Sequence, residues 1–208
     1  MSVDFTFVQA GPPQPLFELM VNIENQMEEM GFKKSGSVYR VELDERGVFE
    51  ENERYIISGK RFSDSEYELQ KWEGLSVEFS CSDYTVYFLI CNYRKQYLNS
   101  FIEVSGKVIE KLISEDEINN LTQLIVTTAV NINSQGGFGT YELPFEPISP
   151  EKIIPYIFSN PEGVPSLLGV IPCGLADEAE VRKMASKEFK LLISTLGFYF
   201  LEHKDFNP

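Results

Sequence analysis

Histidine and cysteine are scarce in this sequence, and each shortage excludes a kind of site. The 208 residues include one histidine, His203, and three cysteines, Cys81, Cys91 and Cys173. A histidine-based triad needs a base held in place by a partner group, which a position so near the end of the chain seldom provides. A zinc site needs about four nitrogen or sulfur ligands, and an odd number of cysteines predicts no disulfide framework. We therefore expect no metal, no cofactor and no catalytic histidine.

Long apolar stretches are missing too. No stretch approaches the roughly 20 residues that a membrane-spanning helix requires. The first residues, MSVDFTFVQAGPPQP, contain an acid and no basic side chain, so they lack the charged start of a secretion signal. Together these absences predict a soluble cytoplasmic protein.

Basic side chains are the third shortage. The chain has 18 lysines and arginines against 32 acids, a net charge of −14, and Lys152 is the one basic residue between Lys111 and Arg182. Such a surface repels phosphate, so we expect neither nucleic acid nor a membrane as a partner. It attracts a basic protein and speeds its approach. Acidity also favours solubility by itself, and that interpretation stays open.

The sequence is rich in alternating apolar residues before residue 91 and in helical patterns after it. The stretch LSVEFSCSDYTVYFLIC predicts a hairpin over residues 75–91 that turns at Ser82 and Asp83, with Phe79 opposite Val86. Further strands are predicted over residues 3–8, 38–43, 54–62, 165–174 and 198–203. Helices are predicted over residues 15–30, 97–112, 149–158 and 177–196, and a further helix is predicted to start at Ser114, with a capping box completed by Glu117. Residues 121–132 fit a helix or a strand, and we favour the helix.

This order predicts an α+β fold, an antiparallel sheet with the hairpin 75–91 at its centre and several amphipathic helices packed mainly on one face. We expect residues 1–208 to form a single domain, with a possible junction between sub-lobes at residues 133–150.

A glycine-rich segment, NSQGGFGTYELPFEP, resembles a phosphate-binding loop in composition alone. No lysine follows its last glycine, and its spacing differs from that of a dinucleotide fingerprint. We expect a mobile connection, and one alternative is a groove beneath it that binds a small ligand or holds a carboxylate-based enzyme site. The residues of this alternative site are Gly136, Gly137, Gly139, Tyr141, Glu142 and Glu146.

The leading hypothesis is a non-enzymatic acidic binding protein that docks to or neutralises a basic protein. The segment ELDERGVFEENE is expected to be an exposed connection that supplies the contacts. Its predicted partner-binding residues are Glu42, Asp44, Glu45, Glu50, Glu51 and Glu53. In size, acidity and scarcity of histidine the chain is similar to bacterial immunity proteins that block a cognate toxin. A third hypothesis is an assembly subunit in which LIVTTAVNI is buried between chains, and the oligomeric state is left open.

Overall fold

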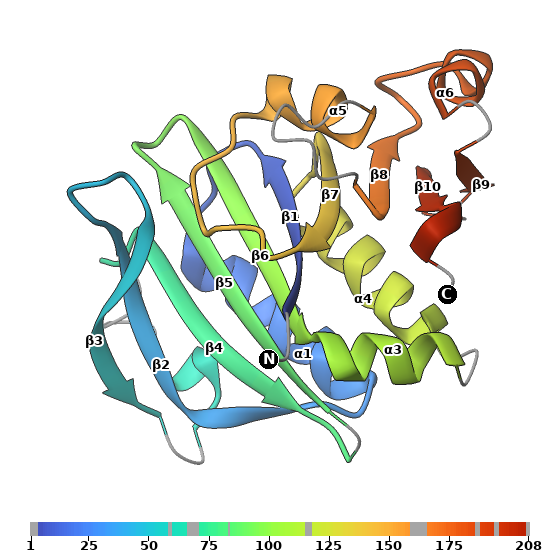
Figure 1. The fold of residues 1–208 in the computed structure, drawn as a ribbon. Coiled ribbons are helices and arrows are strands. Elements are labelled where there is room, and N and C mark those ends of the chain that lie inside the picture. The colour runs from blue at the N-terminus through green and yellow to red at the C-terminus, as the bar shows by residue number, and fades with distance from the viewer. Residues whose placement is uncertain are drawn as a thin grey trace.

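The computed structural model describes residues 4–57, 60–65, 71–82, 84–114, 118–158, 166–185, 188–193 and 196–206. Its strands form one antiparallel sheet of ten strands in the order β3-β2-β4-β5-β6-β1-β7-β8-β10-β9 (Figure 1). The strands are β1 (Asp4–Gly11), β2 (Lys33–Leu43), β3 (Phe49–Ile56), β4 (Gly74–Ser80), β5 (Thr85–Tyr93), β6 (Tyr97–Ser105), β7 (Gly136–Tyr141), β8 (Leu168–Pro172), β9 (Phe189–Ile193) and β10 (Phe198–His203). The α+β class with an antiparallel sheet is thus confirmed.

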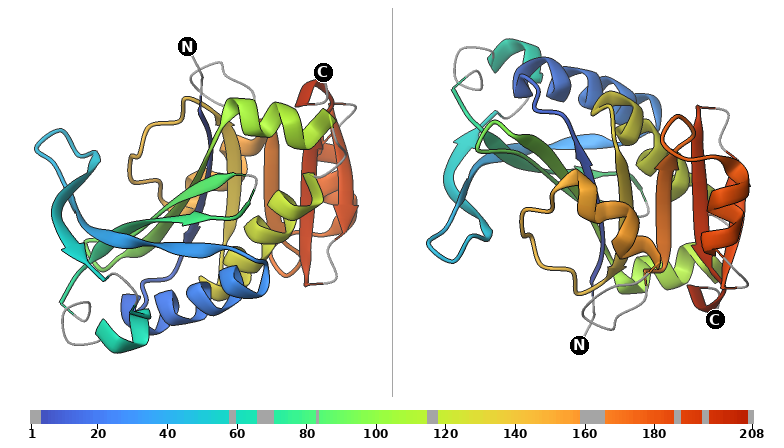
Figure 2. Two further views of the ribbon diagram at one scale, coloured as in Figure 1. Left: turned by 90° about the horizontal axis from the view of Figure 1, so that it is seen from below. Right: turned by 90° about the horizontal axis from the view of Figure 1, so that it is seen from above.

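Helices cover both faces of the sheet. The helices are α1 (Leu16–Glu29), α3 (Gly106–Ser114), α4 (Ile118–Asn131), α5 (Pro150–Phe158) and α6 (Glu178–Ala185). Buried residues of α1, α3 and α4 share one apolar cluster, and buried residues of α5 and α6 belong to the other. We call the first face inner and the second outer, and the two sets of helices lie on opposite sides of the sheet in Figure 2.

The first helix forms where its sequence predicts it. Pro15, with φ −61°, precedes its first turn, and Leu19, Ile23 and Met27 recur at helical spacing on its buried side. Gly31 follows the helix with φ +85°, a left-handed conformation that glycine adopts without steric cost. The chain then turns directly into β2.

The hairpin β4–β5 has the predicted register, with Phe79 opposite Val86 and Leu75 opposite Ile90. All six side chains predicted to face the core are buried in the inner cluster: Leu75, Val77, Phe79, Val86, Phe88 and Ile90. Cys91 lies opposite Gly74 at the far end of the ladder, and all three cysteines are free thiols. The hairpin is third and fourth in the strand order, and β6 and β1 occupy the centre instead.

The helix predicted over residues 97–112 is wrong in its first half, because residues 97–105 form β6. This strand lies between β5 and β1, so residues 98–102 are all buried and the alternation typical of a half-exposed strand is lost. The turn before it contains Arg94 and Lys95 at φ 47° and 58°, a conformation usually signalled by asparagine or glycine.

The last predicted helix is wrong in its second half, where residues 189–193 form β9. Leu192 and Leu196, assigned to a buried stripe, are 42% and 54% exposed. Residues 121–132 fall almost wholly within α4, as favoured, while Glu117 of the predicted capping box lies outside the described residues. The segment LIVTTAVNI is buried within its own chain through Leu124, Ile125 and Ala129, which removes the basis for placing it between chains.

Candidate functional site

The predicted acidic residues lie on a hairpin, not on a loose connection. Strands β2 and β3 pair along residues 37–56, and a tight turn at Asp44–Gly47 joins them. β3 is the end strand of the sheet, and its six residues from Glu50 to Tyr55 include five that are exposed. The prediction of an exposed connection over residues 42–53 is therefore wrong in structure, and a strand predicted to start at Arg54 starts at Phe49.

A bulge divides the acidic side chains between two faces. Arg40 pairs with Glu53 whereas the next residue, Val41, pairs with Glu51. Because paired residues share a face, Glu51 lies on the outer face and Glu53 on the inner one. Glu50 pairs with Glu42 and shares the face of Glu53.

Arginines of the same hairpin neutralise part of the acidic charge. Arg40 forms an ion pair with Glu42 at 2.5 Å and approaches Glu53 at 3.9 Å. In the turn, the backbone N–H of Val48 and the guanidinium of Arg46 donate to Asp44 and lower the pKa of its carboxyl. The six predicted contacts thus form no uniform acidic patch.

Glu51 belongs to a cavity on the outer face of the sheet. It accepts hydrogen bonds from the Tyr87 hydroxyl at 2.9 Å and from Ser76 Oγ. The cavity has a volume of about 330 Å³. Its lining residues come from the four strands β2, β3, β4 and β5: Ser35, Ser37, Tyr39, Glu51, Arg54, Val77, Glu78 and Tyr87. We call this the outer-face cavity.

Negative charge dominates the electrostatics around Tyr87. Burial raises the pKa of its phenol, and the carboxylates of Glu51 and Glu103 raise it further. Glu103, directly opposite Tyr87 on β6, also has a raised pKa because of burial and the nearby charge of Asp4. The hydroxyl is therefore held as a neutral donor to Glu51. The carboxylates of Glu51 and Glu103 both lie near this hydroxyl.

The outer face beside this cavity is covered by the chain itself. Residues 142–149, which we call the strap, run from β7 to α5 and cross in front of the sheet in Figure 1. Phe145 of the strap packs on Tyr87 at 5.7 Å and on Phe101 at 5.3 Å between ring centroids, and its carbonyl accepts the N–H of Phe49. The strap therefore buries Leu89 and Phe101 and leaves the cavity as its open margin.

The glycine-rich segment is a strand, so the mobile connection expected there is wrong. Gly136, Gly137 and Gly139 lie in β7 between β1 and β8 and are buried. A Cβ at Gly139 would lie 2.6 Å from the ring of Phe5, and one at Gly137 would lie 2.7 Å from that of Phe7. These glycines make room for aromatic rings of β1.

The other residues of the alternative site follow this strand. Tyr141 packs edge-on against Phe5, with ring centroids 5.7 Å apart, and burial raises the pKa of its phenol. Glu142 has φ +55° and its N–H donates to the carbonyl of Asp4. Glu146 lies in the strap, and its N–H donates to the carbonyl of Pro144. None of these three residues lines the outer-face cavity or the larger cavity described next.

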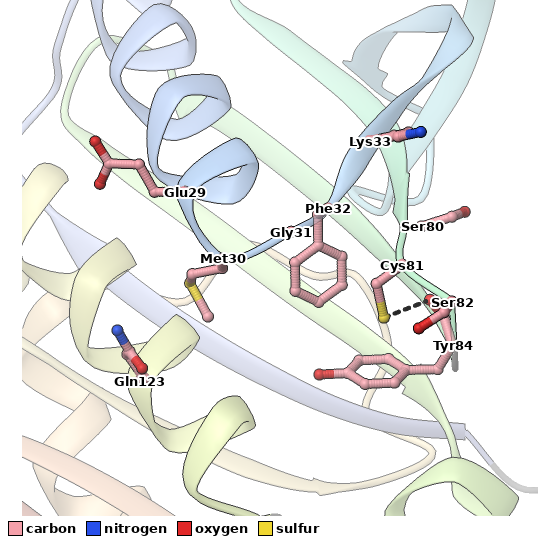
Figure 3. Close-up of a pocket in the computed structure, with 10 residues that line it drawn as sticks. All are labelled: Glu29, Met30, Gly31, Phe32, Lys33, Ser80, Cys81, Ser82, Tyr84 and Gln123. Atoms are coloured by element: carbon pink, nitrogen blue, oxygen red, sulfur yellow. Dashed lines mark hydrogen bonds between the residues drawn. The ribbon is translucent and has the colours of Figure 1, made fainter.

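A larger cavity of about 800 Å³ lies between the end of α1, the β4–β5 turn and α4 (Figure 3). Figure 3 shows the rings of Phe32 and Tyr84 close together, and their centroids are 5.5 Å apart. Cys81 Sγ donates to the carbonyl of Tyr84 at 3.5 Å, and Gln123 lines the cavity from α4. The lining combines aromatic side chains, Phe32 and Tyr84, with polar ones such as Glu29, Ser80 and Gln123.

Sequence reasoning missed Tyr39, Glu78 and Tyr87 as neighbours of Glu51. The predicted register of the hairpin 75–91 places Glu78 opposite Tyr87, so half of the cavity was accessible from the sequence. The residues that β2 and β3 contribute could not be predicted in this way, because their positions depend on the bulge and on which strand pairs with β4.

Within the described ranges, no three or more histidine, cysteine, aspartate or glutamate side chains lie close enough to hold a metal ion. No helix in that part of the chain is both long and apolar enough to cross a membrane. No protein-family model matches the sequence, and no curated protein matches it either.

Proposed function

We propose that this protein is a non-enzymatic binding protein that docks to a basic protein partner, as an immunity protein or inhibitor does. The observation that carries the proposal is the outer-face cavity, where the carboxylates of Glu51 and Glu78 line the same space as the rings of Tyr39 and Tyr87. A lysine or arginine from a partner would set its charge beside the carboxylates and its methylene stem along the rings.

The acidic hairpin extends this contact beyond the cavity. Glu45 in the turn and Glu50 on β3 are exposed. β3 ends the sheet, so its outer row of backbone groups has no strand partner in the described part of the chain, although the N–H of Phe49 donates to Phe145 of the strap. A partner strand with basic side chains fits this edge by main-chain pairing. Charged side chains of both partners would then steer the encounter.

Arg54 is the basic residue on the lining of the cavity, and its positive charge works against the binding of a cationic side chain. Its Nε and Nη2 atoms donate to Ser37 Oγ at 3.1 and 2.9 Å, so the guanidinium is held at the β2 side. Removal of this charge would favour a cationic side chain, which supplies a test with the opposite sign.

The test measures the anisotropy of a labelled oligolysine peptide at low and physiological salt. We expect the double variant Glu51→Gln/Glu78→Gln to weaken binding at least about tenfold, roughly 1.4 kcal/mol. Arg54→Gln should strengthen binding. The matched control Glu110→Gln/Glu180→Gln removes the same charge from exposed positions on α3 and α6 and should change binding less than about twofold.

Equal weakening by both double variants would show that bulk charge alone attracts the peptide, and the proposal would then be wrong. A natural basic partner captured from the source cells should rank the variants in the same order. Neutral behaviour of Arg54→Gln towards that partner would place its contact outside the cavity.

A second candidate is a small-ligand binder at the cavity of Figure 3. Its volume of about 800 Å³ lies within the range of ligand sites, roughly 300–1,000 Å³. Thermal shifts with a metabolite panel would test it, and a stabilising compound should lose its effect in Tyr84→Ala. This second candidate replaces the ligand site that the sequence suggested at Gly136–Glu146.

A further inference from the structure

The strand β9 ends the sheet on the side away from the acidic hairpin. Its one strand neighbour among the described residues is β10. The N–H of Lys204 donates to the carbonyl of Glu188 at 2.8 Å, which continues the β9–β10 ladder. Because antiparallel residues alternate in the direction of their backbone groups, Lys190 and Leu192 direct theirs to β10. Phe189, Leu191 and Ile193 direct theirs to the open edge.

The side chains at this edge are apolar and accessible. Leu192 is 42% exposed, Leu196 in the following turn 54%, and Met184 of α6 41%. Lys190 is the one charged residue within the strand. Monomeric proteins usually protect an end strand with charges, proline or a covering segment, because an open apolar edge pairs with another strand.

The charge of the protein is low around this edge. Residues 174–208 contain six acidic and five basic residues, a net −1, so residues 1–173 carry −13 of the total −14. A strongly basic strand would be attracted to the β3 side of the molecule and not to this one. A second copy of the chain, by contrast, meets little repulsion here.

We propose that two copies of this protein pair through β9, antiparallel and about a two-fold axis, so that their sheets join into one. A two-fold contact uses the same surface twice and needs no second kind of partner. The axis passes beside Leu191, which pairs Phe189 with Ile193 of the other copy and uses the whole strand.

This register is also the one that the charges favour. With Leu191 at the axis, Lys190 lies opposite Leu192 of the other copy, and the lysine stem covers the exposed leucine. A shift that centres the axis on Lys190 would place two lysines opposite each other, which is destabilising. The contact therefore has a register that substitutions can test.

The test is sedimentation velocity of the full chain across micromolar concentrations. We expect the wild type to approach twice its monomer mass of 23.8 kDa. In Leu192→Lys, the new lysine of each copy lies opposite Lys190 of the other copy. This repulsion occurs at both ends of the contact and should raise the dissociation constant of the dimer at least about tenfold. Leu192→Glu sets a carboxylate opposite Lys190 of the other copy and should leave the dimer intact or strengthen it.

Two further variants complete the design. Ile56→Lys places the same charge on the exposed end of β3, where Ile56 is 65% exposed, and should leave the dissociation constant unchanged. Lys190→Glu/Leu192→Lys exchanges the signs across the axis and should restore the dimer.

A monomeric wild type at these concentrations overturns the proposal. Equal loss of the dimer in Leu192→Lys and Leu192→Glu overturns the register, and loss in Ile56→Lys alone moves the contact to β3. Far-ultraviolet circular dichroism of each variant separates a lost contact from a lost fold. Oligolysine binding by a monomeric variant shows that the function proposed above does not depend on this contact.

Discussion

β3 and β9 both end the sheet, and both leave one row of backbone groups without a strand partner in the described part of the chain. β3 has eight residues, three of them glutamates, and a bulge at Asn52 in its middle. β9 has five residues and a single charge. Charge and irregularity protect the first edge against chance pairing, whereas the second is short but apolar and exposed.

The difference shows that net charge is a poor guide to where a surface is acidic. The hairpin of β2 and β3 holds six acidic and five basic residues. Several of the acidic side chains form ion pairs with the basic ones. Its available negative charge lies where hydroxyl groups rather than an arginine donate to the carboxylate, as Tyr87 and Ser76 do to Glu51 in the outer-face cavity. Edges that look alike in a topology diagram thus present surfaces of different charge and polarity.

The largest predicted effect concerns how much the packing of each end strand contributes to the free energy of unfolding. Phe49 starts β3, is 4% exposed and packs on Phe101, with ring centroids 5.9 Å apart. Phe49→Ala should lower the free energy of unfolding by about 3–5 kcal/mol, because it leaves a cavity under the strap. Urea unfolding measures the loss.

The matched variant at the other edge is Phe189→Ala. Phe189 is half-buried, with ring centroids 5.0 Å from His203 and 5.8 Å from Phe158, so we expect a loss of about 1–2 kcal/mol. Monomeric conditions are needed for both variants, since association adds to stability. Equal losses would mean that the two edges are attached alike.

The second prediction compares the contributions to stability of two ion pairs, one on the β3 side of the sheet and one on the β9 side. Glu24 of α1 forms an ion pair with Lys34 of β2 at 2.7 Å, and their side chains are 3% and 8% exposed. Glu24 also accepts the N–H of Phe62 at 2.9 Å. Glu24→Gln keeps this acceptor but leaves the lysine buried without its counter-charge, which should cost about 3 kcal/mol.

Its control is Glu178→Gln on the β9 side. Glu178 and Arg182 are one turn apart on α6 with exposed side chains, so the loss should stay near 0.3–0.5 kcal/mol, on the order of helix-surface pairs. A small loss in both variants, measured by urea unfolding, would show that Lys34 reaches water when Glu24 is neutral.

The smallest effect is a dependence on pH. The pKa of Glu103 is raised by burial and by Asp4, so its ionisation opposes folding. Wild-type stability should therefore fall as pH rises from below the ordinary glutamate value through the raised one. Glu103→Gln keeps an acceptor for Thr6 Oγ1, 3.3 Å from Glu103 Oε2, and removes this penalty.

Thermal unfolding between pH 4 and 7 measures it. The melting temperature of Glu103→Gln should gain on that of the wild type by on the order of 1 °C as pH rises. A gain that grows towards acid pH instead would mean that the carboxylate is stabilised when charged.

The sequence predicts the parts of this fold whose signals are local. The β4–β5 register, α1 with its glycine cap and α5 despite Pro155 follow from alternation, helical spacing and turn residues within short windows. These elements have one face in the core and one in water, so their periodicity is visible.

The sequence fails where a long-range partner decides the outcome. Residues 97–105 and 136–141 are covered on both faces by later or earlier parts of the chain, and their patterns resemble a helix and a loop. The bulge at Arg40 and the pair of Glu24 with Lys34 likewise depend on contacts across strands. The outer-face cavity could not be predicted from the sequence for the same reason, since it is formed by four strands.

The position of β1 has a consequence for how the chain folds during synthesis. This strand lies in the middle of the sheet and is made before both of its neighbours, residues 98–105 on one side and residues 136–141 on the other. At roughly 5–20 residues per second, the ribosome takes several seconds to supply both neighbours. Until then, β1 has no strand partner on either side, so its apolar residues Phe5, Phe7 and Val8, buried in the folded chain, are open to wrong contacts.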